Sequence, residues 1–267
     1  MRRLGLIAFF VVGFAIVVAL LVHWRDEMAP RVRIRQQLFA ELQPVGVPNC
    51  ELERVGERHD GGYLICRNLL KSVRAGYSYG IAGYDEWGCE VSRRLSIPVH
   101  EYDCFDPRRP ACPGGNLIFH DECVAATTRS DAGRRFASLQ DHIARNGDER
   151  KPLMVKMDVE GAEWDSLESA AAGLLGDIDQ LVLELHGVDD EQFLRVIERL
   201  KETFVVAHLH FNNFGCREDL APFPSDAYEV LFVNRRIAGA VSSSAAPRPS
   251  HLDAPNNPQR PDCQHVR

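Results

Sequence analysis

Apolar and polar positions follow two different rhythms along the central part of the chain. Short apolar runs bounded by turn-forming residues predict strands, whereas apolar residues spaced three or four apart predict helices. Strands that alternate with helices in this way predict an α/β fold with a mainly parallel sheet covered on both faces. The predicted strands are residues 76–81, 99–103, 116–120, 153–158, 181–185, 205–211 and 228–234, and the predicted helices are residues 86–95, 138–145, 165–175 and 190–203.

Two hairpins are predicted at the ends of this alternation. Residues 52–55 and 63–66 have strand composition, and the turn-forming residues 59–62 separate them. The last two predicted strands have only the turn-rich residues 212–227 between them. We therefore expect these two strands to close the sheet as an antiparallel pair.

The longest apolar run lies at the N-terminus. Residues 4–22 carry no charge and no strongly polar side chain. As a helix they would be about 28 Å long, close to the roughly 30 Å of a bilayer's hydrocarbon core. This predicts a transmembrane anchor over residues 1–22, with a cleaved signal peptide or a buried helix as alternatives. Arginines flank both ends, so orientation stays open, with a cytosolic domain slightly favoured over a lumenal one.

The rest of the chain divides into three parts. Residues 23–48 are predicted to be a juxtamembrane stalk, in which residues 30–42 form a basic amphipathic helix at the membrane surface or a plain solvated helix. Residues 49–238 form the folded domain. Residues 239–267 are rich in Ser, Pro, Ala and Asn, which predicts a disordered tail.

Charge and cysteine content narrow the partners and the class of site. The formal net charge is −7, and no long basic run lies in the domain. Nucleic acid is therefore not expected as a partner, because phosphate binding favours clustered Lys and Arg. None of the eight cysteines forms a CxxC pair, which speaks against a zinc ribbon. We expect buried free thiols, with disulfides as the alternative if the domain faces an oxidising compartment.

The first motif with chemical meaning follows the strand at 76–81. Gly80, Ile81 and Gly83 form a turn into the next helix. Ligands of doubly wound sheets bind at the carboxyl ends of strands, and glycine lets the backbone approach a ligand closely. A simple strand-to-helix turn is the alternative. The spacing departs from GxGxxG, which speaks against NAD or FAD.

Acidic residues follow the second predicted strand of the sheet. Asp103 and Asp106 lie roughly 20 residues after the glycine turn, where an acid can accept hydrogen bonds from ribose hydroxyls. Either residue could hold the ribose, and capping of the next turn is the simpler interpretation. Together, the glycine turn and the acid favour a cofactor that contains adenosine.

Charged residues gather most densely at residues 156–163. Lys156 and Asp158 alternate along a strand and share a face, and Glu160 and Glu163 follow in the turn into a helix. Charges at the carboxyl end of a strand belong to a site more often than to a plain surface. We expect Asp158 to orient the cofactor's amino group or to act as a base, whereas Glu163 suits the first turn of a helix.

A group of histidines completes the set of candidates. His208 and His210 share a face of a predicted strand, Asn212 is next on that face, and His186 ends a neighbouring strand. We expect these groups to bind a hydroxylated substrate, with a divalent metal or a purely structural role as alternatives. No metal is predicted as a resident cofactor.

The string KMDVEGAEW at residues 156–164 resembles the signature of FkbM-type methyltransferases and of related methyltransferase-like proteins with an N-terminal membrane anchor. Shorter strings agree with that family in order and spacing over residues 54–236. They are DGGY at 60–63, YSYGI at 77–81, LELH at 183–186, HFNN at 210–213 and EVLFVN at 229–234.

The resemblance implies a seven-stranded, Rossmann-like methyltransferase sheet that binds S-adenosylmethionine. The glycine motif is GIAG, where many methyltransferases have GxGxG. Gly80 and Gly83 would face the methionine, Asp103 or Asp106 the ribose, and Asp121 and Glu122 the adenine. The full set of expected cofactor-binding residues is Gly80, Ile81, Gly83, Asp103, Asp106, Asp121, Glu122, Asp158 and Glu160.

The expected reaction is methyl transfer to a hydroxyl of a sugar, a lipid or another membrane-associated acceptor. We expect Asp158 or His186 to be the base that such an acceptor needs, with Lys156 as the third member of the catalytic group. Two other functions stay open. One is a nucleotide-sugar or NAD enzyme on the same anchor, and the other is a membrane-tethered binding module built on a degenerate fold.

Overall fold

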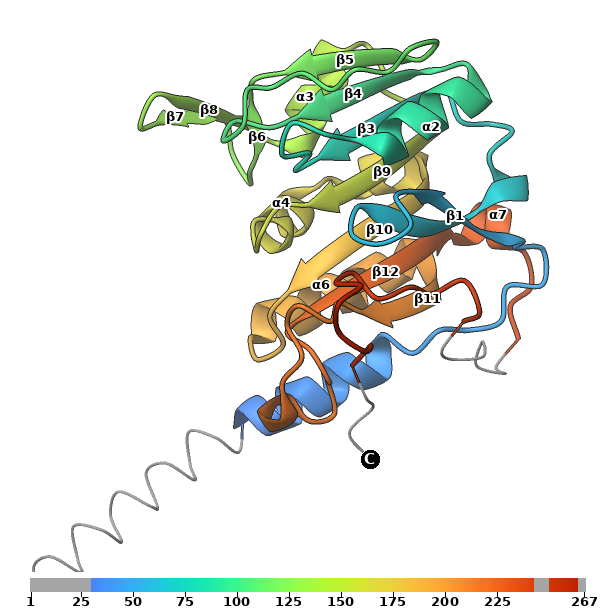
Figure 1. Cartoon of the computed structure of the whole chain (residues 1–267), viewed down its shortest axis with the longest axis vertical. Helices are drawn as coiled ribbons and strands as arrows, with labels where there is room; N and C mark the ends of the chain where they lie inside the picture. The colour runs from blue at the N-terminus through green and yellow to red at the C-terminus, as the bar shows by residue number, and fades with distance from the viewer. Residues whose placement is uncertain (1–29, 243–249, 264–267) are drawn as a thin grey trace, which may run out of the picture.

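A seven-stranded sheet forms the centre of the computed structural model, which describes residues 30–242 and 250–263 (Figure 1). The strand order is β11-β12-β10-β9-β3-β4-β5. Every strand that the sequence predicted for the sheet is present. They are β3 (Ala75–Tyr79), β4 (Pro98–Tyr102), β5 (Asn116–His120), β9 (Leu153–Asp158), β10 (Ile178–His186), β11 (Phe204–Phe211) and β12 (Ala227–Asn234).

The direction of the strands confirms a mainly parallel sheet. The strands from β5 to β10 pair in parallel, whereas β12 is antiparallel to both β10 and β11. The predicted antiparallel pair of last strands is therefore confirmed, with β12 inserted between β10 and β11. The chain builds outward from β3 to β5 and then returns to place β9 on the other side of β3. This reversal makes the gap between β3 and β9 the switch point, where doubly wound sheets bind ligands.

Each face of the sheet has its own hydrophobic core. Successive strand residues alternate between the two cores, as Val155 and Met157 do on one face and Met154 on the other. The first face is covered by α3 (Leu139–Arg145), α4 (Glu163–Ser169), α5 (Ala172–Asp177) and α6 (Glu191–Thr203), and the second by α2 (Glu86–Leu95) and α7 (Arg235–Ala238). The helix predicted over residues 165–175 is split, because Ala170 and Ala171 have extended backbones.

The predicted first hairpin is confirmed and packs on the second face. β1 (Leu52–Gly56) and β2 (Gly62–Cys66) pair antiparallel. The backbone of Cys66 is tied to the Gln180 side chain on β10 by hydrogen bonds of 2.8 and 2.9 Å. This attachment places the turn of the hairpin over the carboxyl edge of the sheet.

One small sheet was not predicted. It consists of β6 (Cys123–Val124), β7 (Arg129–Asp131) and β8 (Arg134–Ala137), and the β7–β8 hairpin projects from the body of the molecule (Figure 1). All residues of β7 are exposed. Such a strand has no buried face, so it lacks the apolar alternation on which the prediction depends.

The helix at residues 30–41 belongs to the domain. Leu38 and Leu42 are fully buried in the first core. Arg35 is only 3% exposed and forms an ion pair with Asp189 at 2.5 Å. The prediction of a stalk up to residue 48 is therefore wrong for residues 30–42, because Leu38 and Leu42 pack into the first core instead of facing a membrane surface or solvent.

The predicted anchor at residues 4–22 lies outside the described residues, as does the part of the predicted stalk before residue 30. Among the residues that the structure does describe, no helix combines the length and the apolar character needed to cross a bilayer.

The C-terminal segment 250–263 is ordered, so the prediction of a disordered tail is wrong there. Asn256 is 2% exposed and donates hydrogen bonds to Asp60 and Glu229. Asp253 pairs with His208 at 2.8 Å. Polar contacts and one disulfide hold this segment in place. A prediction based on apolar content detects neither of these interactions.

All eight cysteines form disulfides, so the expectation of free thiols is wrong. Their positions in separate loops and strands gave no sign of which cysteines would meet. The pairs are Cys50–Cys66, Cys89–Cys112, Cys104–Cys123 and Cys216–Cys263.

Candidate active site

The carboxyl ends of β3 and β9 meet closely at the switch point. Gly80 follows β3 with a φ of +74°, and a Cβ added there would lie 1.6 Å from the backbone oxygen of Asp158. Only glycine fits such a contact. Lys156 is 4% exposed, and its Nζ donates to the Gly80 oxygen at 2.9 Å. Gly80 and Lys156 therefore fix the two strand ends against each other.

Asp158 presents a carboxylate at this junction. Its Oδ2 accepts a hydrogen bond of 3.0 Å from the Tyr63 hydroxyl and lies 3.8 Å from Lys156 Nζ. A quarter of its side chain is exposed, so one side remains open to a ligand. Burial, followed by the charge of Asp158, raises the pKa of Tyr63 well above its ordinary value, which keeps the hydroxyl a donor.

His186 ends β10 beside this junction. Its backbone N–H and its Nδ1 lie 2.7 and 3.0 Å from Oε1 of Glu163, which is fully buried. Glu163 in turn accepts a hydrogen bond of 2.8 Å from the Gly161 amide. The first-turn acid of α4 thus orients the imidazole, which the sequence did not reveal.

The other ring nitrogen of His186 faces carboxylates. Nε2 lies 3.6 Å from Glu160 and 3.7 Å from Glu184. Burial lowers the pKa of His186, but the hydrogen bond and charge of Glu163 and the charge of Glu184 outweigh it and raise the pKa to about 9.

Glu184 and Asn212 lie next to His186, deeper in the sheet. Glu184 Oε1 accepts a hydrogen bond of 2.7 Å from Asn212 Nδ2, and its Oε2 has no partner among the described residues. Burial and the charges of Asp158 and Glu229 raise the pKa of Glu184 well above its usual range. Asn212 was predicted to bind substrate, but its amide is taken up by Glu184 and by the Phe214 amide, which donates to Oδ1 at 2.9 Å.

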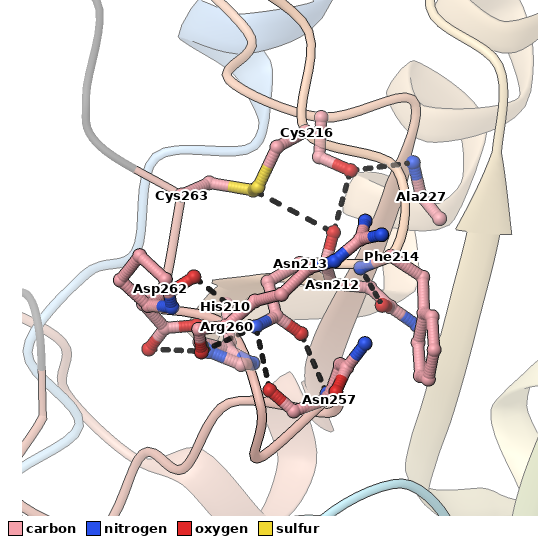
Figure 2. The surroundings of a disulfide bond; sticks show 12 residues. His210, Asn212, Asn213, Phe214, Cys216, Ala227, Asn257, Arg260, Asp262 and Cys263 are labelled. Carbon is pink, nitrogen blue, oxygen red and sulfur yellow. Dashed lines mark hydrogen bonds and ion pairs between the residues drawn. A yellow bond between two sulfur atoms is a disulfide. The ribbon is translucent and has the colours of Figure 1, made fainter.

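The structure does not bring His208 and His210 to the same place as His186. Both are 5% exposed and lie on the far side of β12. His208 pairs with Asp253. His210 lies 3.2 Å from Glu229 and 3.3 Å from Asp262, which Figure 2 shows beside the Cys216–Cys263 disulfide. These contacts with the C-terminal segment match the structural alternative for the two histidines.

The two candidate ribose acids have different surroundings. Asp103 Oδ2 accepts a hydrogen bond of 2.9 Å from the Ala82 amide, and Oδ1 accepts from the amides of Phe105 and Asp106. Asp103 therefore caps the turn. Asp106 binds the exposed Arg108, whose side-chain and backbone hydrogen bonds lower the pKa of that carboxyl. Arg108 also donates to the Ala82 oxygen at 3.0 Å, which places Asp106 beside the glycine turn.

The candidates at the end of β5 also divide. Glu122 is buried and pairs with His142 at 3.3 Å and with Arg145 at 2.9 Å. Asp121 is exposed, and its backbone oxygen accepts a hydrogen bond of 2.9 Å from Arg135. Only Asp121 thus has a carboxylate that is open to solvent.

A pair of buried acids lies on the second face, under α2. Glu101 on β4 is fully buried, and Asp85 caps α2 by accepting a hydrogen bond of 2.8 Å from the Gly88 amide. Burial and the adjacent Asp85 raise the pKa of Glu101 to about 9. Glu101 therefore carries a proton at neutral pH. The sequence analysis missed it, although an acid inside a predicted strand is a visible signal.

No known family model matches the chain, and no characterised protein matches it significantly in sequence.

Proposed function

We propose that the chain is an S-adenosylmethionine-dependent methyltransferase that acts on a hydroxyl group. The observation that carries the proposal is the switch point itself. Gly80 and Asp158 meet there, and Lys156 binds the two strand ends together. Ligands of doubly wound sheets bind in this crevice. The resemblance of residues 156–164 to FkbM-type methyltransferases supports this cofactor over a dinucleotide.

The residues around the switch point fit the cofactor. The glycine turn keeps bulky side chains away, and Asp103 holds the backbone of that turn in place. Asp106 would release its ion pair with Arg108 and accept hydrogen bonds from the ribose hydroxyls instead. Asp121 follows β5, further along the carboxyl edge of the sheet. When bound, the cofactor supplies a methyl group that already carries its leaving group and positive charge.

Asp158 is the base in this proposal. A hydroxyl acceptor must lose its proton as its oxygen bonds to the methyl carbon and the carbon–sulfur bond breaks. The open side of the Asp158 carboxylate can accept that proton. Tyr63 and Lys156 hold the carboxylate from its other side and so fix its direction.

We further propose that the domain faces an oxidising compartment. Its cysteines are all paired, and such disulfides persist outside the cytosol. The charges flanking the predicted anchor slightly favoured the cytosol, and the disulfides outweigh that weak preference. A sugar or lipid of the secretory pathway is then the acceptor class.

Calorimetry on the full chain tests the cofactor. We expect S-adenosylmethionine to bind and NAD⁺ not to bind. Asp106→Asn should weaken binding at least tenfold, since a hydrogen bond to a charged group contributes about 1.5–3 kcal/mol. Asp131→Asn, on the exposed β7 strand, is the matched control and should change nothing.

Other outcomes of the same titration would contradict the proposal. Binding of NAD⁺ instead would favour an oxidoreductase. If neither ligand binds to a folded chain, the domain is better described as a binding module.

A further inference from the structure

Three potential metal ligands converge at the carboxyl ends of two neighbouring strands. Asp158 ends β9, Glu160 lies in the turn after it, and His186 ends β10. One ligand atom from each side chain lies within 4.8 Å of the others. Because β9 and β10 are adjacent and parallel, their last residues lie at the same edge of the sheet.

The imidazole is oriented as a metal ligand would be. The buried Glu163 engages Nδ1 of His186, and this contact turns Nε2 toward Glu160 and Glu184. Metal-binding histidines almost always donate their other ring N–H to a carboxylate, a carbonyl or water. Glu163 is itself fixed by the Gly161 amide, so the ring has little freedom.

Glu184 provides a second, independent observation. Its side chain is only 6% exposed, and its Oε1 lies 3.7 Å from Nε2 of His186. Its Oε2 is buried with no partner in the part of the chain that the structure describes. A buried carboxylate oxygen without a donor is costly, and a cation beside it would supply the missing counter-charge.

Negative charge exceeds positive charge around this point. Four carboxyl groups, those of Asp158, Glu160, Glu163 and Glu184, lie around His186, and among the described residues Lys156 is the lysine that lies beside Asp158, at 3.8 Å. Such an excess attracts a small divalent cation.

We infer that Asp158, Glu160 and His186 bind a divalent cation of the Mn²⁺ or Mg²⁺ class, with Glu184 beside it. Carboxylates suit Mg²⁺ and Mn²⁺, and imidazole suits transition metals, so Mn²⁺ satisfies both ligand types. Cation binding does not depend on the proposed methyl transfer. Only the cation's role in the reaction rests on the proposed methyl transfer. A hydroxyl group coordinated to the cation would lose its proton more readily, which would assist Asp158 as the base.

Manganese binding to the full chain tests this inference. After treatment with EDTA and desalting, the chain is titrated with Mn²⁺, and free Mn²⁺ is followed by its electron paramagnetic resonance signal. We expect one saturable site per chain, from which Mg²⁺ displaces Mn²⁺. Glu160→Gln should weaken binding at least tenfold. The Glu160 side chain is 88% exposed, so this variant should fold normally.

Glu149→Gln is the matched control, because Glu149 is exposed and precedes the opposite end of β9. It should bind Mn²⁺ as the wild type does. No saturable binding by the wild type, or equal affinity in Glu160→Gln, would overturn the inference. S-adenosylmethionine binding is measured on the same metal-free sample. Mn²⁺ binding without cofactor binding would support the cation site and contradict the methyltransferase proposal. Cofactor binding without Mn²⁺ binding would contradict the cation site and leave the methyltransferase proposal in place.

Discussion

Lys156 stabilises the site through the backbone. Its buried ammonium donates to the Gly80 oxygen at 2.9 Å and lies 3.4 Å from the Tyr79 oxygen. We expect Lys156→Met to leave these acceptors unsatisfied and to lower the free energy of unfolding by about 2 kcal/mol. Urea denaturation measures this. Lys151→Met is the control, and its half-exposed ion pair with Asp148 should cost less than about 1 kcal/mol. Equal losses would contradict the proposed role.

Glu101 should make stability depend on pH. Its pKa rises from 4.5 to about 9 on folding, so the folded state holds a proton that the unfolded state releases. Stability is therefore lost as the pH rises from about 4.5 to about 9. We expect Glu101→Gln to be more stable than the wild type by up to about 5 kcal/mol near pH 8, since pH 8 lies 3.5 units above the ordinary pKa of 4.5 and each unit corresponds to about 1.4 kcal/mol.

Urea denaturation near pH 5 and near pH 8 compares the two proteins. The difference should shrink at the lower pH, because pH 5 lies close to the unfolded pKa of 4.5 and little of the free energy has been lost there. A constant difference would show that the effect comes from packing.

The sequence predicted some residues of the candidate site and missed others for a common reason. Lys156, Asp158 and His186 lie at or near the carboxyl ends of predicted strands. The order of strands and helices predicts that these ends meet at one edge of the sheet. Tyr63 and Glu184 were missed. Tyr63 reaches Asp158 only because its hairpin packs on the second face of the sheet. The Glu184 carboxyl group is held beside His186 by a hydrogen bond from Asn212. Tertiary contacts of this kind leave no local pattern.

Among the larger elements, the C-terminal segment 250–263 depends on one covalent link. The Cys216–Cys263 disulfide joins it to the loop after β11. We expect the double variant Cys216→Ser/Cys263→Ser to exchange amide hydrogens faster in this segment, because the remaining contacts are mostly polar. Hydrogen–deuterium exchange with mass spectrometry measures this. The variant Cys89→Ser/Cys112→Ser, which opens a distant disulfide, should leave the segment protected. Faster exchange in both variants would point to general loosening.

Helices and strands were predictable where burial of one face produces a regular pattern of apolar residues in the sequence. All strands of the main sheet and both hairpins have such a face. β7 has none, and the helix at residues 30–41 shows a stripe that fits a membrane surface as well as a protein core. The stripe does not show what it packs against, and the sequence analysis did not expect the domain's own core, where Leu38 and Leu42 lie.

For the molecule as a whole, the four disulfides determine the conditions under which it is stable. They close loops with sequence separations of 16 to 47 residues. We expect a reductant to lower the melting temperature, since each disulfide contributes about 2–4 kcal/mol. Maleimide labelling of the denatured protein from cells should modify no cysteine before reduction and all of them afterwards. Labelling before reduction would argue against an oxidising compartment.

The pairing itself could not come from the sequence, because eight cysteines allow on the order of 100 connectivities. The fold class could, because the alternation of strands and helices extends over the whole domain. The position of the switch point followed from the fold class. The disulfide pairing could be determined only from the arrangement of the loops in space.

The position of β12 constrains how the molecule is made. β12 lies between β10 and β11, although it is the last strand of this sheet along the chain. A nascent chain that ends before residue 227 has finished every other strand of the sheet, yet the facing edges of β10 and β11 have nothing to pair with. Unpaired edges invite aggregation. During synthesis these edges therefore stay unpaired until β12 is made. A premature stop before β12 would leave a split sheet rather than a shortened but intact domain.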